Sequence, residues 1–169
     1  MRKFCLLFLL CGCVNSTQNS YLFFNNPSVF LSSAERMVGM NEYSNRSELR
    51  EFMGVDTVRY QWCAAFVNSI LELHSIPGSE SVSDNPLMAR SFLDWGTVVD
   101  EPRVGDIVVF PRGNQGWQGH VGFYTETVII DNVSYYVILG GNQNNQVSYD
   151  LYAANRAIGI RRAPTDSEE

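Results

Sequence analysis

One thiol stands out among the residues of this 169-residue chain that could carry chemistry. Of the four cysteines, three lie within the first 13 residues, and only Cys63 lies in the body of the chain. Cys63 stands at the predicted start of a helix, where unpaired backbone N–H groups favour a thiolate over a thiol. The position therefore predicts a nucleophile; the alternative is a small buried core residue.

A cysteine nucleophile needs a base, and the chain has two histidines. His74 follows Cys63 by eleven residues on the same predicted helix, about 16 Å away, which is too far for proton transfer. His120 follows a glycine-rich loop and opens a predicted strand. We therefore expect His120 to be the base; the alternative is a partly buried structural histidine.

An amide is the candidate for the group that orients the imidazole. Asp131-Asn132 predicts the turn of a hairpin, and pairing about residue 131 places His120 opposite Asn142 to within one or two residues. The neighbouring Gln143 is the alternative, and Asn142 could also be a plain turn residue. A thiol, an imidazole and an amide are the nucleophile, base and orienting group of cysteine hydrolases.

The same register pairs Gly122 with Gly140, which leaves a shallow spot on one face of the predicted sheet. A helix packed there would bring Cys63 to His120.

The elements that must position these residues change character along the chain. Capping signals and apolar stripes predict helices first, starting after Ser32 and over residues 45–53, 62–74 and 87–95. Runs rich in Val, Ile, Tyr and Phe then predict strands over residues 106–110, 120–128, 135–140 and 157–162. This order predicts the α+β class, with N-terminal helices packed on a small antiparallel β-sheet.

The first residues read as an export signal. Arg2 and Lys3 precede an apolar run over residues 4–10, which is too short to span a membrane. The run 10–13, LCGC, resembles a bacterial lipobox, which implies cleavage before Cys13 and attachment of lipid to it. A net charge of −6 and scattered arginines argue against a nucleic-acid partner.

Five blocks of the sequence resemble the CHAP family of cysteine, histidine-dependent amidohydrolases and peptidases. They are WCAAFVN at 62–68, ARSFLDWG at 89–96, GDIVVF at 105–110, GHVGFY at 119–124 and LGGNQ at 139–143. The resemblance implies a papain-like fold with the catalytic cysteine at a helix N-terminus. It implies Cys63 as nucleophile, His120 as base and Asn142 as orienting residue. Many members carry an acidic residue two positions before that amide, where this chain has Gly140.

The resemblance also implies a substrate and a place in the cell. We expect a peptidoglycan hydrolase that cleaves an amide or peptide bond of the stem or cross-bridge peptide, without a metal or organic cofactor. Gln61 and Tyr60 are candidate oxyanion donors, and Trp117 is a candidate wall of the substrate groove. The alternatives are a non-catalytic envelope lipoprotein that binds wall peptide or a protein partner, and a phage lysis enzyme or antibacterial effector with the same chemistry.

The expected organisation follows from these interpretations. A signal peptide occupies residues 1–12, an anchor and linker 13–30, a CHAP-like cysteine hydrolase domain 31–163, and an acidic tail 164–169. Such a protein would be exported and lipid-anchored at the periplasmic face of the bacterial envelope, or otherwise secreted.

Overall fold

The computed structural model describes residues 27–164, and the structural statements below concern these residues. The predicted signal peptide over residues 1–12, Cys13 with its predicted lipid, and the acidic tail after residue 164 lie outside the described residues. Within residues 27–164, no helix combines the length and the apolar character that crossing a membrane requires.

The first described helix begins earlier than the sequence predicted. Helix α2 spans Pro27–Glu35, so the end of the linker predicted over residues 13–30 is helical. Ser32, predicted to cap the helix, lies inside it and donates its hydroxyl hydrogen to the carbonyl of Val29. The helix begins instead at Pro27. Proline lacks a backbone N–H, and this costs nothing at the first helical position because N–H groups in the first turn have no partner within the helix.

The other helices lie close to their predicted ranges. Their bounds are α3 Arg46–Met53, α4 Cys63–Leu73, and the short 3-10 helices η1 Ser79–Ser81, η2 Ala89–Asp94 and η3 Ala154–Arg156. Asn45 precedes α3 as predicted, and Gly54 ends it with a φ of 69°, in the left-handed region that glycine tolerates best. The segment predicted as a helix over residues 87–95 is the shorter 3-10 helix η2.

The strands form one antiparallel sheet in the order β1-β6-β2-β3-β4-β5. Their bounds are β1 Thr97–Val98, β2 Ile107–Pro111, β3 Gly119–Ile130, β4 Val133–Gln143, β5 Gln146–Ala153 and β6 Gly159–Arg162. The predicted α+β class, with helices on a small antiparallel sheet, is confirmed. Strands β1 and β5 were not predicted from the sequence.

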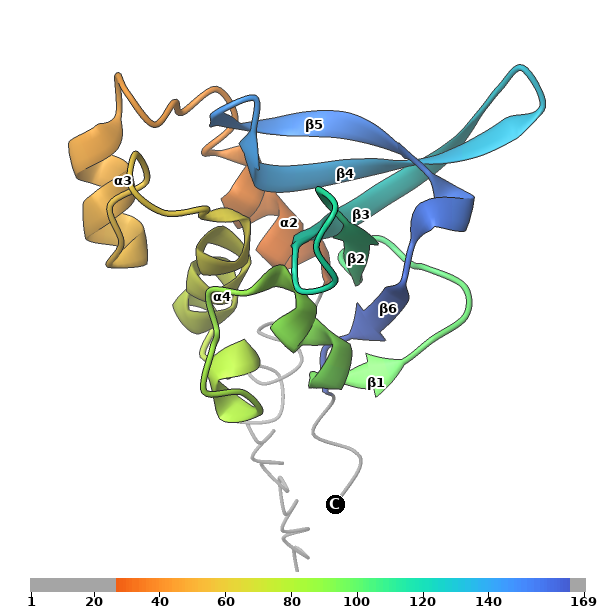
Figure 1. Cartoon of the computed structure of the whole chain (residues 1–169), viewed down its shortest axis with the longest axis horizontal. Coiled ribbons are helices and arrows are strands. Elements are labelled where there is room, and N and C mark those ends of the chain that lie inside the picture. The colour runs from red at the N-terminus through yellow and green to blue at the C-terminus, as the bar shows by residue number, and fades with distance from the viewer. Residues whose placement is uncertain (1–26, 165–169) are drawn as a thin grey trace, which may run out of the picture.

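Strands β3 and β4 form the predicted hairpin, whose turn projects away from the helices (Figure 1). Asp131 and Asn132 both have positive φ, 49° and 63°, as a tight two-residue hairpin turn requires. Phe123 pairs with Leu139, in the predicted register. The register shifts by one residue between Tyr124 and Glu126, so the pairs nearer the turn are displaced.

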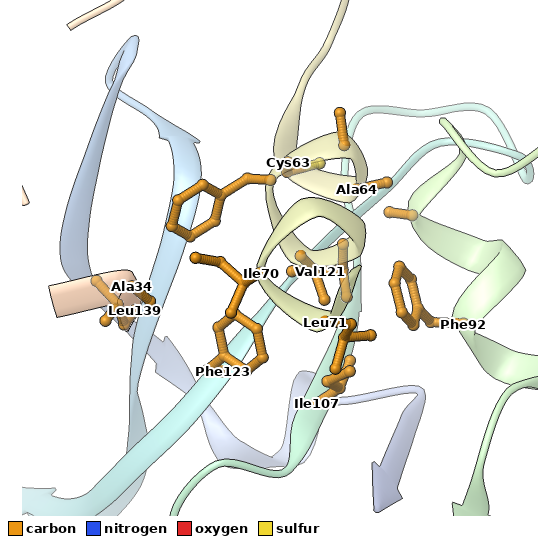
Figure 2. Packing of buried hydrophobic residues seen from close by; sticks show 14 of the residues in the cluster. Ala34, Cys63, Ala64, Ile70, Leu71, Phe92, Ile107, Val121, Phe123 and Leu139 are labelled. Atoms are coloured by element: carbon orange, nitrogen blue, oxygen red, sulfur yellow. The ribbon is translucent and has the colours of Figure 1, made fainter. Parts of the chain in front are cut away.

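Helices α2 and α4 pack against one face of the sheet. Figure 2 shows Ile70 and Leu71 of α4 among side chains of the strands, with Cys63 near one end of the helix. Buried residues of the strands, such as Val121 and Phe123, complete this main core. The opposite face of the sheet carries a smaller apolar cluster that includes Phe110 and Tyr124.

The helix approaches the sheet at a different glycine from the predicted pair. A Cβ atom added to Gly141 would lie 2.6 Å from a ring carbon of Trp62 and 2.7 Å from the Cβ of Phe66. A Cβ on Gly122 would instead meet the side chain of Ile138, which belongs to the cluster on the opposite face. The prediction that α4 packs over Gly122 is therefore wrong, and Gly141 is the residue that admits the helix.

Candidate active site

Cys63 is the first residue of α4, as the sequence predicted. Its side chain is 3% exposed and lines a cleft of about 300 Å³ that lies between the start of α4, the segment before η2, and the loop before β3. Burial raises the pKa of the Cys63 thiol. The charge of Arg112 and the backbone N–H groups of Val121, Ala64 and Cys63 itself lower that pKa. Because burial is the largest of these effects, the resting side chain is a thiol that these donors prepare for ionisation.

His120 lies near the start of β3 and is fully buried. Its ring stacks on that of Tyr152, with centroids 5.1 Å apart and planes inclined by 19°. Tyr152 stacks in turn on Phe110, at 4.6 Å and 24°. The two aromatic rings therefore fix the plane of the imidazole.

The tautomer of His120 follows from its contact with Gln143. The Nε2 atom of His120 lies 3.0 Å from Oε1 of Gln143. The amide nitrogen of Gln143 donates to the carbonyls of Ile138 and Ser148, so its oxygen is the atom turned toward the ring. Since that oxygen can only accept, Nε2 of His120 carries the hydrogen and Nδ1 holds a free lone pair.

Nδ1 of His120 is buried and has no hydrogen-bond partner among residues 27–164. Burial, followed by the positive charge of Arg112, lowers the pKa of His120 to about 3, while the contact with Gln143 raises it. The imidazole is therefore neutral at pH 7, with its basic nitrogen free to accept a proton.

The amide beside His120 is that of Gln143, not that of Asn142 as the sequence favoured. The pairing of β4 with β5 is irregular between Gly140 and Gln143, where two residues of β4 lie opposite one of β5. Side chains alternate between the two faces of a strand, so an inserted residue moves Gln143 to the face that Asn142 would have taken. A Cβ on Gly140 would lie 3.3 Å from both the Nε2 of His120 and the Oε1 of Gln143, which places all three on this face.

Helix α4, which begins at Cys63, packs against β3, which carries His120. The backbone N–H of Val121, the residue after His120, donates toward the Cys63 thiol. Tyr152 lies near both residues, because its ring stacks on His120 and a negative charge on Cys63 raises its pKa.

His74 lies at the other end of α4 from Cys63, as predicted. Its Nε2 forms a hydrogen bond with the hydroxyl of Ser33.

The three residues predicted to contact substrate have different positions. Gln61 and Trp117 line the cleft with Cys63, and Trp117 is 61% exposed. Asn142 donates its amide hydrogen to the side-chain oxygen of Gln61 at 2.9 Å, which leaves the two N–H donors of Gln61 outside this contact. Tyr60 does not line this cleft: it is 56% exposed and lines a separate pocket with residues of α3 and the segment 54–59.

Two residues near the site, Arg112 and Tyr152, were not predicted from the sequence. Arg112 follows the last residue of β2 and lines the cleft, where its Nη2 donates to the carbonyl of Asn142 at 3.3 Å. Tyr152 belongs to the unpredicted strand β5. The alternating apolar residues after Asn144-Asn145 carried a signal for that strand, whereas nothing in the sequence singled out Arg112.

Two acidic residues in the resembling region are structural. Glu42 is buried and accepts a hydrogen bond from the indole N–H of Trp62, the residue before α4, at 2.9 Å. Asp106 accepts from the backbone N–H of Arg103 and forms an ion pair with Arg162 at 2.7 Å, so it ties the start of β2 to β6. Within residues 27–164, no group of three or more His, Cys, Asp or Glu side chains is arranged to hold a metal ion.

A thiol at the start of α4 and a neutral imidazole on β3, held by the amide of Gln143, are the kinds of group that cysteine-dependent hydrolases use. Comparison with protein families matches residues 55–142, more than half of the chain, to the CHAP domain. The chain belongs to the CHAP domain family. Membership indicates a hydrolase of the amidase or peptidase type with peptidoglycan as its substrate. A comparison with curated proteins gives no match.

Proposed function

We propose that this protein hydrolyses an amide or peptide bond of the peptidoglycan peptide, with Cys63 as nucleophile and His120 as general base. Gln143 takes the orienting role for which the sequence favoured Asn142. The observation that carries the proposal is the buried Nδ1 atom of His120, which has a free lone pair and no partner within residues 27–164. A buried nitrogen without a partner is costly, and a base that receives a proton only during reaction accounts for it.

The proposed reaction begins with a neutral pair. As the Cys63 sulfur attacks the carbonyl carbon, its proton passes to Nδ1 of His120. The positive charge that forms on the ring is stabilised by the Oε1 of Gln143, which accepts from Nε2–H. His120 then donates the proton to the nitrogen of the breaking C–N bond, the amine leaves, and a thioester forms on Cys63.

Water completes the reaction by the reverse sequence of proton transfers. His120 takes a proton from water, the hydroxyl oxygen attacks the thioester carbon, and the C–S bond breaks. The sulfur recovers its proton from His120, and the carboxylic acid leaves. The same base therefore serves both halves of the reaction.

We assign two donors to the oxyanion of each tetrahedral intermediate. The backbone N–H of Cys63 belongs to the first turn of α4, where N–H groups have no partner within the helix. The side-chain amide of Gln61 lines the same cleft, and Asn142 holds its oxygen. We assign Asn142 to this indirect role and exclude Tyr60, which does not line the cleft.

The cellular setting is part of the proposal. The export signal over residues 1–12 and lipid on Cys13 would hold the enzyme at the bacterial envelope, close to the wall. Mass spectrometry of the N-terminal peptide after expression in a bacterium tests this: a diacylglyceryl group on Cys13 supports an anchored enzyme, and cleavage elsewhere without lipid supports a secreted one.

The function is tested on purified peptidoglycan. The full chain, Cys63→Ala and the matched surface control Ser47→Ala are incubated with the wall, and the released fragments and new amine ends are identified by mass spectrometry. Release of fragments by the first and third proteins alone supports the hydrolase, and the new ends distinguish an amidase from an endopeptidase. Silence of all three across walls of different cross-bridge type would favour the binding lipoprotein.

A further inference from the structure

Arg112 is a half-buried cation in the cleft of Cys63 without a carboxylate beside it. None of the residues lining the cleft is acidic. The ion pairs found within residues 27–164 join Asp56 to two arginines of its own neighbourhood and Asp106 to Arg162, and none includes Arg112. On a chain with a net charge of −6, an arginine that lacks a counter-ion within this region is conspicuous.

The guanidinium of Arg112 is held in place but not saturated. Its Nη2 atom donates to the carbonyl of Asn142, and its positive charge acts to lower the pKa of the nearby Tyr152 hydroxyl. A guanidinium has five N–H donors in a rigid planar fork. The contact with Asn142 of β4 therefore sets its direction and leaves donors for a molecule in the cleft.

The ordinary alternative is that Arg112 acts only on the thiolate. Its charge lowers the pKa of Cys63, so it favours ionisation of the nucleophile. The same charge also lowers the pKa of His120, which opposes protonation of the base. The two effects oppose each other in the transfer of a proton from one to the other, so activation of the pair is a weak reason for a cation here.

We propose that Arg112 is an anion-binding position of the cleft, which holds a carboxylate of the substrate next to the carbonyl that Cys63 attacks. The ligand class is a peptide with a free carboxylate close to the scissile amide. A planar guanidinium fork in the cleft can pair with both carboxylate oxygens, which fixes the position of the substrate as well as its charge. This inference rests on the proposed function for its substrate but not for its test.

The test compares two alkylating reagents of nearly equal size on the full chain. Iodoacetate carries a carboxylate and iodoacetamide is its neutral counterpart, so the ratio of their rates at Cys63 reports whether the cleft attracts a carboxylate. We measure both rates by mass spectrometry of the Cys63 peptide, in wild type, Arg112→Gln and Arg112→Lys. The control is Arg50→Gln, which removes an exposed arginine of α3 that does not line this cleft.

We expect Arg112→Gln to lower the ratio of the iodoacetate rate to the iodoacetamide rate by about tenfold. Arg112→Lys should retain part of the preference, because the charge remains without the fork. Arg50→Gln should leave the ratio unchanged. Should Arg112→Gln not fold, as judged by circular dichroism, the comparison rests on Arg112→Lys, and an unchanged ratio there overturns the proposal.

Two other results overturn it. An equal fall of both rates in Arg112→Gln means that the arginine acts on the thiolate alone. Failure of both reagents to modify Cys63 removes the accessible thiol that the subsite needs.

The anion site and the proposed function can fail separately. If Arg112→Gln loses the preference for iodoacetate but the wild-type protein releases nothing from peptidoglycan, the proposed function is contradicted and the anion site is supported. If the wild-type protein hydrolyses peptidoglycan but the ratio of the two rates is unchanged in Arg112→Gln, the anion site is contradicted and the proposed function is supported.

Discussion

The Nε2 atom of His120 lies 3.0 Å from the Oε1 atom of Gln143, and this contact decides which nitrogen of the ring is the base. The amide nitrogen of Gln143 is occupied by the carbonyls of Ile138 and Ser148, so the glutamine cannot turn over and present a donor. The imidazole is consequently held as the Nε2–H tautomer, with Nδ1 free.

Replacing Gln143 tests this contact. Gln143→Ala removes the acceptor for Nε2–H of His120. The imidazole is then no longer held in the Nε2–H tautomer, and its positive charge is no longer stabilised during the reaction. We expect kcat to fall on the order of 10²-fold. Asn142→Ala should cost less, because Asn142 contacts Gln61 and not the imidazole. Steady-state kinetics on soluble wall fragments measures both. A larger loss in Asn142→Ala than in Gln143→Ala would restore the assignment that the sequence favoured.

The burial of His120 predicts a stability that depends on pH. Its pKa is lowered to about 3 in the folded chain, against 6.5 for an unperturbed histidine. Between these values the unfolded chain binds a proton that the folded chain does not, so the free energy of unfolding decreases as the pH falls. The stabilisation is complete above about pH 6.5 and is lost toward pH 3, with a limiting slope of about 1.4 kcal/mol per pH unit.

Urea unfolding at pH 7, 6 and 5 measures this slope in wild type and in His120→Gln. The slope should be shallower in the variant, whatever its absolute stability. His74→Gln serves as the comparison, because burial also lowers the pKa of His74 and contributes a slope of the same sign. Parallel curves for wild type and His120→Gln would show that His120 is not the buried neutral base described above.

The close approach of α4 to Gly141 predicts that a larger residue at this position destabilises the fold. A Cβ there would lie within 2.7 Å of Trp62 and Phe66, so Gly141→Ala must displace the start of α4 from the sheet. We expect a loss of about 1–3 kcal/mol in the free energy of unfolding, together with slower alkylation or hydrolysis at Cys63. Gly116→Ala is the matched control, because nothing lies within 4 Å of its added Cβ and its effect should be small. Equal stability of the two variants would contradict the close approach of α4.

The sequence predicted the parts of the site that depend on local signals. The helix that begins at Cys63 carries an apolar stripe, and the turn at Asp131-Asn132 carries residues that accept positive φ. Each of these signals depends on a few neighbouring residues, so distant parts of the fold do not change the structure that it predicts. They were enough to predict the helix that begins at Cys63 and the hairpin that carries His120.

The identity of the orienting amide depended on a strand that was not predicted. Gln143 faces His120 only because the pairing of β4 with β5 contains an extra residue after Gly140. That irregularity belongs to two strands together, and alternation within β4 alone assigns the face to Asn142. Arg112 was missed for a related reason, since its place in the cleft is set by strands from three parts of the chain rather than by its neighbours in sequence.

In the proposed mechanism, Cys63 carries the acyl half of the substrate as a thioester. The most direct measurement is acid quenching of the full chain during turnover of wall fragments, followed by mass spectrometry of the Cys63 peptide. We predict an adduct with the mass of the acyl half of the cleaved bond, present in wild type and absent from Cys63→Ala, which should release no product. Release of product by Cys63→Ala at the wild-type rate, or an acyl adduct on another residue, would contradict this mechanism.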